Sequence, residues 1–119
     1  MNLEDIRNLC LSFPGVTEDF PFDENTLVFR VMGKMFLLVD VVQADRINIK
    51  CNPEEAVELR ERFPTVLPGY HMNKVHWNTV MLKGAYPPGA LASWIRDSYN
   101  LILASVPVRK RVEAGFAPL

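Results

Sequence analysis

The segment GYHMNKVHWNT, residues 69–79, concentrates the side chains of this sequence that could do chemistry. It holds two histidines, a lysine, a tryptophan and two asparagines. Imidazoles can ligate a metal ion or move protons, and lysine and asparagine can donate hydrogen bonds to an anion. The segment could therefore be a metal site, a catalytic cluster or a polar surface that binds a partner.

The spacing of the two histidines does not favour a metal site. His71 and His76 are five positions apart, so they point to opposite faces of a strand and stand about 140° apart on a helix. The segment has no Cys, Asp or Glu to complete a ligand set. The sequence therefore predicts no metal ion at this segment.

Catalysis by a cysteine and a histidine would require an exposed, activated thiol. Cys10 and Cys51 both lie in apolar patterns, which predict buried free thiols instead. The glycines of Pro14-Gly15 and Pro88-Gly89 mark turns and lack the spacing of a nucleotide-binding loop. A histidine and an aspartate from distant positions could still meet in the fold, but the sequence favours a protein that is not an enzyme and binds no cofactor.

Local signals predict the helices that must position these residues. An apolar repeat over residues 2–12 predicts a short amphipathic helix that stops at Pro14-Gly15. Asn52-Pro53 supplies an N-cap and a first-turn proline for a second helix that runs to about residue 62. The longest amphipathic pattern begins at Leu91 and closes near Pro107.

Alternating and β-branched residues predict the strands. They cover residues 16–22, two strands within 26–41, then 45–51 and 75–82. Gly33-Lys34 is expected at the centre of a type II′ hairpin turn, because glycine adopts the positive φ of its first position. The order of elements predicts an α+β fold of two layers, in which helices cover one face of an antiparallel sheet and leave the other open to water.

Length and composition predict one small domain. The chain has 119 residues and a formal net charge of -1, which argues against a protein that coats nucleic acid by bulk charge. We expect a domain over residues 1–108 and a loosely ordered C-terminal tail over residues 109–119. No apolar run approaches the roughly 20 residues of a membrane span and the start is unlike a signal peptide, so we expect a cytoplasmic protein.

Strand alternation collects polar side chains on the open face of the predicted sheet. A strand that is regular from Val75 places Trp77 in the core. The polar open face suits phosphate oxygens and base edges of a nucleic acid. The hairpin tips at 33–34 and 43–46 could protrude as wings that reach a groove or the backbone of the nucleic acid. An ordinary polar strand face without a ligand explains the same pattern. No carboxylate is predicted among the outward strand positions. The residues predicted at these positions are Arg30, Arg46, Asn48, Lys50, Lys74, His76 and Asn78.

The motifs of the chain resemble those of the MmcQ/YjbR family over nearly its whole length. They are FPG, FRVMGKMF, IKCNPEEA, PGYHMNKVHWNTV and SYNLILASVP, in this order, and GYHMNKVHWN is the most specific of them. The resemblance implies a fold like that of the frataxin homologue CyaY and a "double-wing" mode of DNA binding. Frataxin-like proteins bind iron along an acidic first helix, which here offers only Glu4 and Asp5, so iron delivery is not expected.

Together, the residues and the resemblance predict a non-enzymatic DNA-binding protein, monomeric and of modest affinity. The alternative is a protein-interaction or small-ligand-binding module that uses the same polar face. The side chains expected to contact phosphates and grooves are Arg30, Lys34, Arg46, Lys50, His71, Asn73, Lys74, His76 and Asn78.

Overall fold

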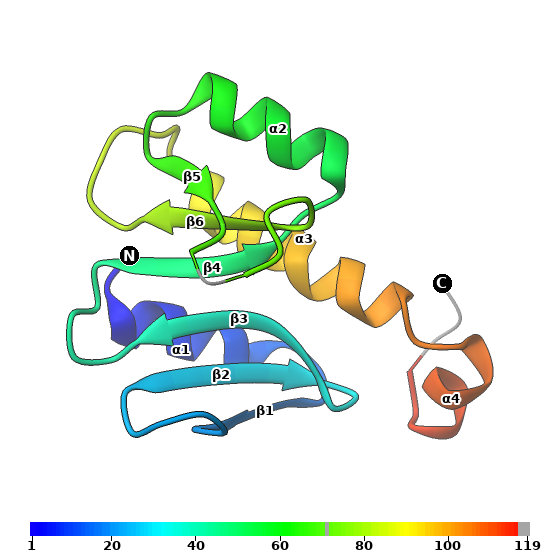
Figure 1. The fold of residues 1–119 in the computed structure, drawn as a ribbon. Helices are drawn as coiled ribbons and strands as arrows, with labels where there is room; N and C mark the ends of the chain where they lie inside the picture. The colour runs from blue at the N-terminus through cyan, green and yellow to red at the C-terminus, as the bar shows by residue number, and fades with distance from the viewer. Residues whose placement is uncertain (71, 117–119) are drawn as a thin grey trace.

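The computed structural model describes residues 1–70 and 72–116 (Figure 1). His71, one of the predicted contact residues, lies outside the described residues. Along the chain the elements are α1 (Leu3–Ser12), β1 (Val16–Asp19), β2 (Thr26–Val31), β3 (Lys34–Asp40), β4 (Arg46–Lys50), α2 (Pro53–Arg62), β5 (Val66–Pro68), β6 (Trp77–Met81), α3 (Ala90–Ala104) and α4 (Val108–Glu113).

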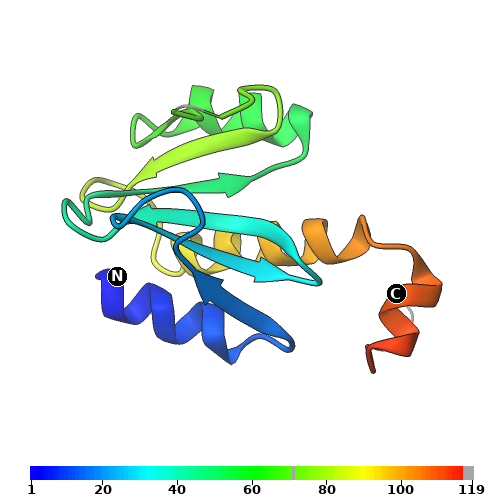
Figure 2. The same ribbon diagram turned by 60° about the horizontal axis from the view of Figure 1, so that its bottom comes forward.

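The strands form one antiparallel sheet in the order β1-β2-β3-β4-β6-β5. Figures 1 and 2 show α1 and α3 on the same side of this sheet. One core cluster joins Ile6 of α1 and Ile95 of α3 to Phe29, Leu37 and Ile49 of the strands. The predicted two-layer α+β fold, with helices on one face of an antiparallel sheet, is confirmed.

Both α1 and α2 begin at an asparagine N-cap, of which the one at Asn52 was predicted, whereas Asn2 was expected inside the first helix. In α1 the Asn2 side chain accepts a hydrogen bond from the Asp5 backbone N–H at 2.8 Å, and the Asp5 carboxylate accepts one from the Asn2 N–H at 3.1 Å. In α2 the Asn52 side chain accepts from the Glu54 N–H, and Pro53 occupies the first turn. Each cap stabilises its helix by about 1 kcal/mol. Among the described helices, none is long and apolar enough to span a membrane.

The hairpin between β2 and β3 turns one residue earlier than predicted. Val31 pairs with Lys34, and the two residues between them, Met32 and Gly33, have φ of 53° and 77°. Positive φ at both central positions defines a type I′ turn, whose twist matches that of the strands. The predicted type II′ turn at Gly33-Lys34 is therefore wrong. Met32 packs against the core cluster, which offsets the cost of its left-handed backbone.

The tip between β3 and β4 holds a second left-handed residue, Ala44, with φ of 49°. We expect Ala44→Gly to raise the free energy of unfolding by about 0.5 to 1 kcal/mol, because relief of the Cβ clash outweighs the added entropy of the unfolded chain. Urea unfolding measures the change. Ala92→Gly, inside α3, is the matched control and should lower stability by about 1 kcal/mol; a similar loss at residue 44 would contradict the assignment of strain.

The C-terminal segment is held more firmly than predicted. Residues 108–113 form α4, which lies beside the end of the sheet where β2 finishes (Figure 1). Arg111 is 4% exposed and donates from its guanidinium to the carbonyl oxygens of Leu103, Ala104 and Val106. The prediction of a loose tail is thus corrected for residues 109–113, because these bonds tie α4 to the end of α3.

Candidate functional site

The open face of the sheet, opposite the helices, is the predicted binding surface, but Asn78 does not lie on it. Asn78 pairs with the core residue Ile49 and is 1% exposed. Its Nδ2 donates to the Ala56 carbonyl oxygen at 3.2 Å and lies 3.7 Å from the Cys51 sulfur. Asn78 therefore braces α2 against β6, and the prediction that it faces solvent is wrong.

Trp77 is buried, as predicted, but on the opposite side of the sheet from the helices. It is 8% exposed and packs with Val28 and Leu38 in a second cluster, which Met35 and Met72 flank. Both faces of β6 are consequently buried. This explains the error at Asn78, because apolar alternation cannot tell the two faces of such a strand apart.

The loop between β5 and β6, in its described residues 69–70 and 72–76, packs on the open face through Met72 and uses its own polar groups to hold its shape. The Asn73 side chain accepts from the Val75 N–H at 2.9 Å, and the Asn73 carbonyl oxygen accepts from the N–H groups of His76 and Trp77. Lys74 Nζ donates to the Gly69 carbonyl oxygen at 2.9 Å. Asn73 is thus chiefly a turn residue, whereas the exposed Lys74 side chain stays at the surface.

The two arginines predicted on the open face are neutralised by neighbouring aspartates. Arg30 Nε lies 3.2 Å from an Asp19 carboxylate oxygen, and an Arg46 guanidinium nitrogen lies 3.1 Å from Asp45. The hydrogen bond from Arg46 lowers the pKa of Asp45. Such exposed pairs stabilise the fold little, but they reduce the positive charge offered to a ligand. The prediction counted Asp40 and Asp45 against the surface but no carboxylate among the outward strand positions, and Asp19 of β1 corrects the second point.

Lys34 lies at the rim of the sheet, on the helix side. It pairs with Val31, a core residue, and its Nζ donates to Ser105 Oγ at 3.2 Å at the end of α3. A cation near a helix C-terminus is favoured by the helix dipole. Lys34 can contribute charge to the rim but does not share the open face.

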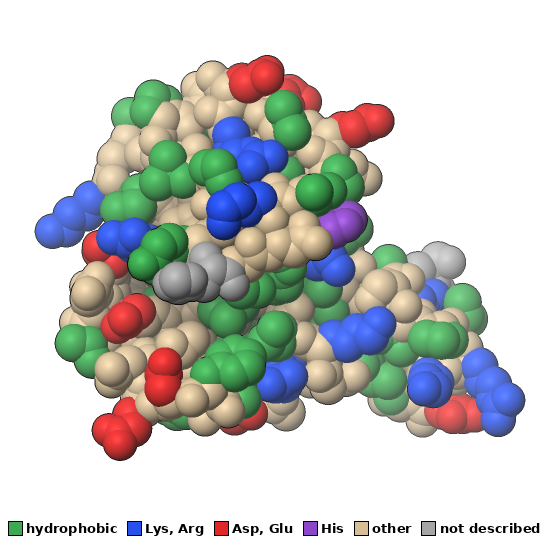
Figure 3. Space-filling model, in the orientation of Figure 1, with side chains coloured by type: hydrophobic (Ala, Val, Ile, Leu, Met, Phe, Trp, Pro, Cys, Tyr) green, Lys and Arg blue, Asp and Glu red, His purple; other side chains and the backbone are tan. Residues whose placement is uncertain are grey.

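The remaining charges divide the open face into two ends. Figure 3 shows most Lys and Arg side chains from the upper middle to the lower right, with others at the left edge, and Asp and Glu side chains at the lower left, with others at the upper right and lower right rims. The cationic end, where β2 and β4 finish, comprises Arg30, Lys74, His76 and Lys50, which also lines the space between α2 and α3. The acidic end, where β2 and β4 begin, comprises Asp23, Asp40 and Asp45, with Arg46 paired among them.

A groove of about 600 Å³ lies in the open face next to the acidic end. All three aspartates of that end line it, together with Leu38 and Met72. Phe22 and Tyr70 also line it and are 63% and 58% exposed. The groove therefore combines apolar walls with negative charge.

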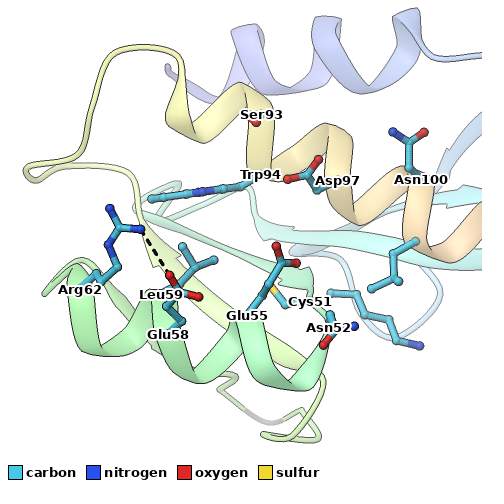
Figure 4. A pocket seen from close by; sticks show the side chains of 12 residues that line it. Cys51, Asn52, Glu55, Glu58, Leu59, Arg62, Ser93, Trp94, Asp97 and Asn100 are labelled. Carbon is cyan, nitrogen blue, oxygen red and sulfur yellow. Dashed lines mark hydrogen bonds and ion pairs between the residues drawn. The ribbon is translucent and has the colours of Figure 1, made fainter.

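A second groove, of about 510 Å³, separates α2 from α3 (Figure 4). Glu55 and Asp97 project into it from the two helices, and Glu58 pairs with Arg62 at 3.5 Å. Cys51 lines it, but burial raises the pKa of this thiol to about 11.

Burial disfavours the thiolate form of both cysteines. Burial raises the pKa of Cys10 to about 12, and both cysteines are buried and free, as predicted. A thiol whose pKa lies this far above neutrality is almost entirely protonated, and the thiolate is the reactive form. Among the described residues, no group of three His, Cys, Asp or Glu side chains could hold a metal ion.

The architecture defines a small α+β protein with a six-stranded antiparallel sheet and helices on one face. The chain belongs to the YjbR family, whose model matches residues 11–101. This confirms the resemblance seen in its motifs.

Curated relatives match the chain over nearly its whole length. It is 34% identical to the uncharacterized protein YbdF of Escherichia coli O157:H7, with 94% of each chain covered. It is 29% identical to the uncharacterized protein YjbR of Escherichia coli K12, covering 93% of this chain and 95% of that protein. Their names describe no activity.

Two solved structures share the fold. The crystal structure of Deinococcus radiodurans protein DR2400 has a TM-score of 0.91 and 38% identity, covering 98% of this chain and 90% of that one. A crystal structure of a Pseudomonas syringae protein has a TM-score of 0.71 and 28% identity, covering 86% and 99%. Both likenesses support the arrangement of sheet and helices described above.

Proposed function

We propose that this chain is a non-enzymatic DNA-binding protein that holds phosphate groups at the cationic end of its open face. The observation that carries the proposal is the separation of charge along the sheet. Arg30, Lys50, Lys74 and His76 come from β2, β4 and the loop over 69–76, yet they share one end of the face. The ion pairs of the described residues do not include Lys50 or Lys74, so both ammonium groups keep their charge for phosphate oxygens. Lys74 gives one of its three N–H donors to the Gly69 carbonyl oxygen.

The number of available cations limits the affinity. Arg30 is already paired with Asp19, and Lys34 contributes only from the rim. With about 3 phosphates neutralised, the logarithm of the binding constant should fall with the logarithm of salt concentration at a slope of about 0.9 per phosphate. The acidic end repels the same backbone, which restricts DNA to one part of the face.

Replacing both Lys50 and Lys74 by alanine is expected to weaken binding to duplex DNA about 10-fold and to reduce the salt slope by about 2, because two phosphate contacts are lost. Fluorescence anisotropy with a labelled duplex at several salt concentrations measures both quantities. The matched control removes Lys83 and Arg62, two charges away from the cationic end, and should leave the slope unchanged. If the salt slope of the Lys50 and Lys74 variant equals that of the wild type, these two residues do not contact phosphates.

A comparison of ligands tests whether the protein recognises DNA or only charge. The open face offers Asn48 as well as cations, and an amide can hydrogen-bond to base edges. Duplex DNA should therefore bind more tightly than heparin at equal salt concentration. Equal affinity for both polymers would show that the face reads charge alone.

A further inference from the structure

We propose that the open face is also self-complementary, and that two copies of this chain associate through it. In this dimer the cationic end of one copy meets the acidic end of the other. The two-fold axis of the dimer lies between the two facing sheets, parallel to them and perpendicular to the strands. The proposal concerns protein association and stands independently of DNA binding.

The charge pattern selects this arrangement. Asp45, just before β4, and Lys50 at its end are five residues apart, which corresponds to about 16 Å along an extended chain; Arg46, beside Asp45, offsets part of the negative charge there. A half-turn about an axis across the strands places Lys50 of one copy over Asp40 and Asp45 of the other, and the reverse contact forms at the same time. An axis along the strands would bring like charges together. A closed dimer with two equivalent contacts is the usual result of such a self-complementary patch.

Apolar side chains lie where the two faces would meet. Phe22 and Tyr70 are more than half exposed, yet both line the groove beside Leu38 and Met72. Exposed apolar and aromatic groups gathered on one face mark surfaces that bind protein, and aromatic residues are frequent anchors there. The groove of about 600 Å³ is large enough to receive side chains from a facing surface. Figure 3 shows hydrophobic side chains between the two charged ends.

A second copy fits this face better than an unrelated partner of one charge. A purely basic peptide would satisfy Asp23, Asp40 and Asp45 but would meet repulsion from Lys50 and Lys74. An acidic partner would meet the opposite difficulty. The chain itself carries both charges at the matching separation. Because the dimer covers Lys50 and Lys74, self-association and DNA binding compete for the same end of the face.

Sedimentation equilibrium of the full chain, from about 10 µM to about 1 mM protein, tests the proposal. We expect a dissociation constant for the dimer within this concentration range. The wild type should dimerise, and the dimer should weaken as salt concentration rises. Two charge variants provide the decisive comparison: Gln43→Lys with Asp45→Lys at the acidic end, and Lys50→Glu with Lys74→Glu at the cationic end. Each alone should be monomeric, because both contacts become repulsive.

An equimolar mixture of these two variants should dimerise again, since each contact then joins opposite charges. A defect in folding cannot produce this recovery. Glu58→Lys with Glu61→Lys, on α2, is the control for a general change of charge and should associate like the wild type. A mixture that stays monomeric, with both variants unfolding thermally like the wild type, would overturn the proposal.

Phe22→Ser provides a test that does not depend on charge or on the stability of the variants, because this side chain is already exposed. It should weaken dimerisation about 10-fold or more, and an unchanged constant would overturn the proposal. Adding duplex DNA to the wild-type dimer separates the two hypotheses. A dimer that ignores DNA would contradict only the proposed function, whereas DNA binding by a chain that is monomeric throughout would contradict only the dimer.

Discussion

Asn78→Asp is expected to lower the free energy of unfolding by about 3 kcal/mol or more at neutral pH. Asn78 is 1% exposed, and its Nδ2 donates to the Ala56 carbonyl oxygen. A carboxylate has no proton to donate, so it would face that carbonyl oxygen as an uncompensated negative charge. Urea unfolding at pH 7 measures the loss.

The same substitution should make stability depend on pH. Burial raises the pKa of the introduced carboxyl in the folded protein above its unfolded value of about 3.9. Stability is therefore greatest below the unfolded pKa, where the group is protonated in both states, and is lost as pH rises through the folded pKa. Much of the loss at pH 7 should be recovered near pH 4, relative to the wild type at the same pH.

Asn48→Asp is the matched control, because Asn48 lies on the open face, where it is half-buried, and already uses its oxygen to accept from Thr79 Oγ1. A carboxylate can accept the same hydrogen bond, so we expect a loss below about 1 kcal/mol. Equal losses in the two variants would show that Asn78 does not occupy the buried position assigned to it.

The features that sequence predicted best are those governed by neighbouring residues. Asn2 and Asn52 cap their helices through backbone groups two or three residues away, and Pro53 acts at its own position. The Asn52-Pro53 cap located α2 and the apolar repeat over residues 2–12 located α1, and with the strand patterns they established the α+β fold. The strand β5 was missed because three residues, one of them Pro68, give no periodicity to detect.

The errors at the candidate site arise from contacts between residues distant in sequence. Asp19 reaches Arg30 only because β1 pairs with β2, with Asp19 opposite Val28. The face on which Asn78 lies is determined by its pairing with Ile49 of β4. Neither pairing follows from the composition of one strand. The polar residues of the GYHMNKVHWN motif consequently looked like a binding surface, although several of them build the loop.

Gly84 and Thr65 illustrate the same limit. A Cβ at Gly84 would lie 2.0 Å from Thr65 Cγ2, and the φ of Gly84 is +149°. The sequence identifies a glycine between two elements, but only the folded chain brings Thr65, just before β5, beside it. Close backbone approaches of this kind cannot be predicted from local propensity, because the neighbour comes from another element.

Gly69→Ala is expected to lower the free energy of unfolding by about 2 to 3 kcal/mol, because it overpacks the loop against β6. A Cβ at this position would lie 2.8 Å from both the Cβ and the carbonyl oxygen of Trp77, and 3.1 Å from Met72 Cβ. The Gly69 N–H also donates to that carbonyl oxygen at 2.9 Å. Trp77 cannot easily give way, because it is paired in β6 and packed in the second cluster.

Gly33→Ala is the matched control for this prediction. Gly33 has φ of +77°, and a Cβ added there would have no heavy atom of the described residues within 4 Å beyond its chain neighbours. Its substitution therefore tests backbone strain alone and should cost about 1 to 2 kcal/mol. Tryptophan fluorescence distinguishes the two variants, because only Gly69→Ala should shift the emission of buried Trp77.

The Gly69 variant should also affect the cationic end of the open face. Lys74 donates to the Gly69 carbonyl oxygen, so a displaced loop should carry Lys74 with it and flatten the salt dependence of DNA binding. Gly33→Ala leaves this hydrogen bond intact and should keep the salt dependence of the wild type. A Gly69 variant with unchanged emission and unchanged stability would show that the loop does not lie against Trp77.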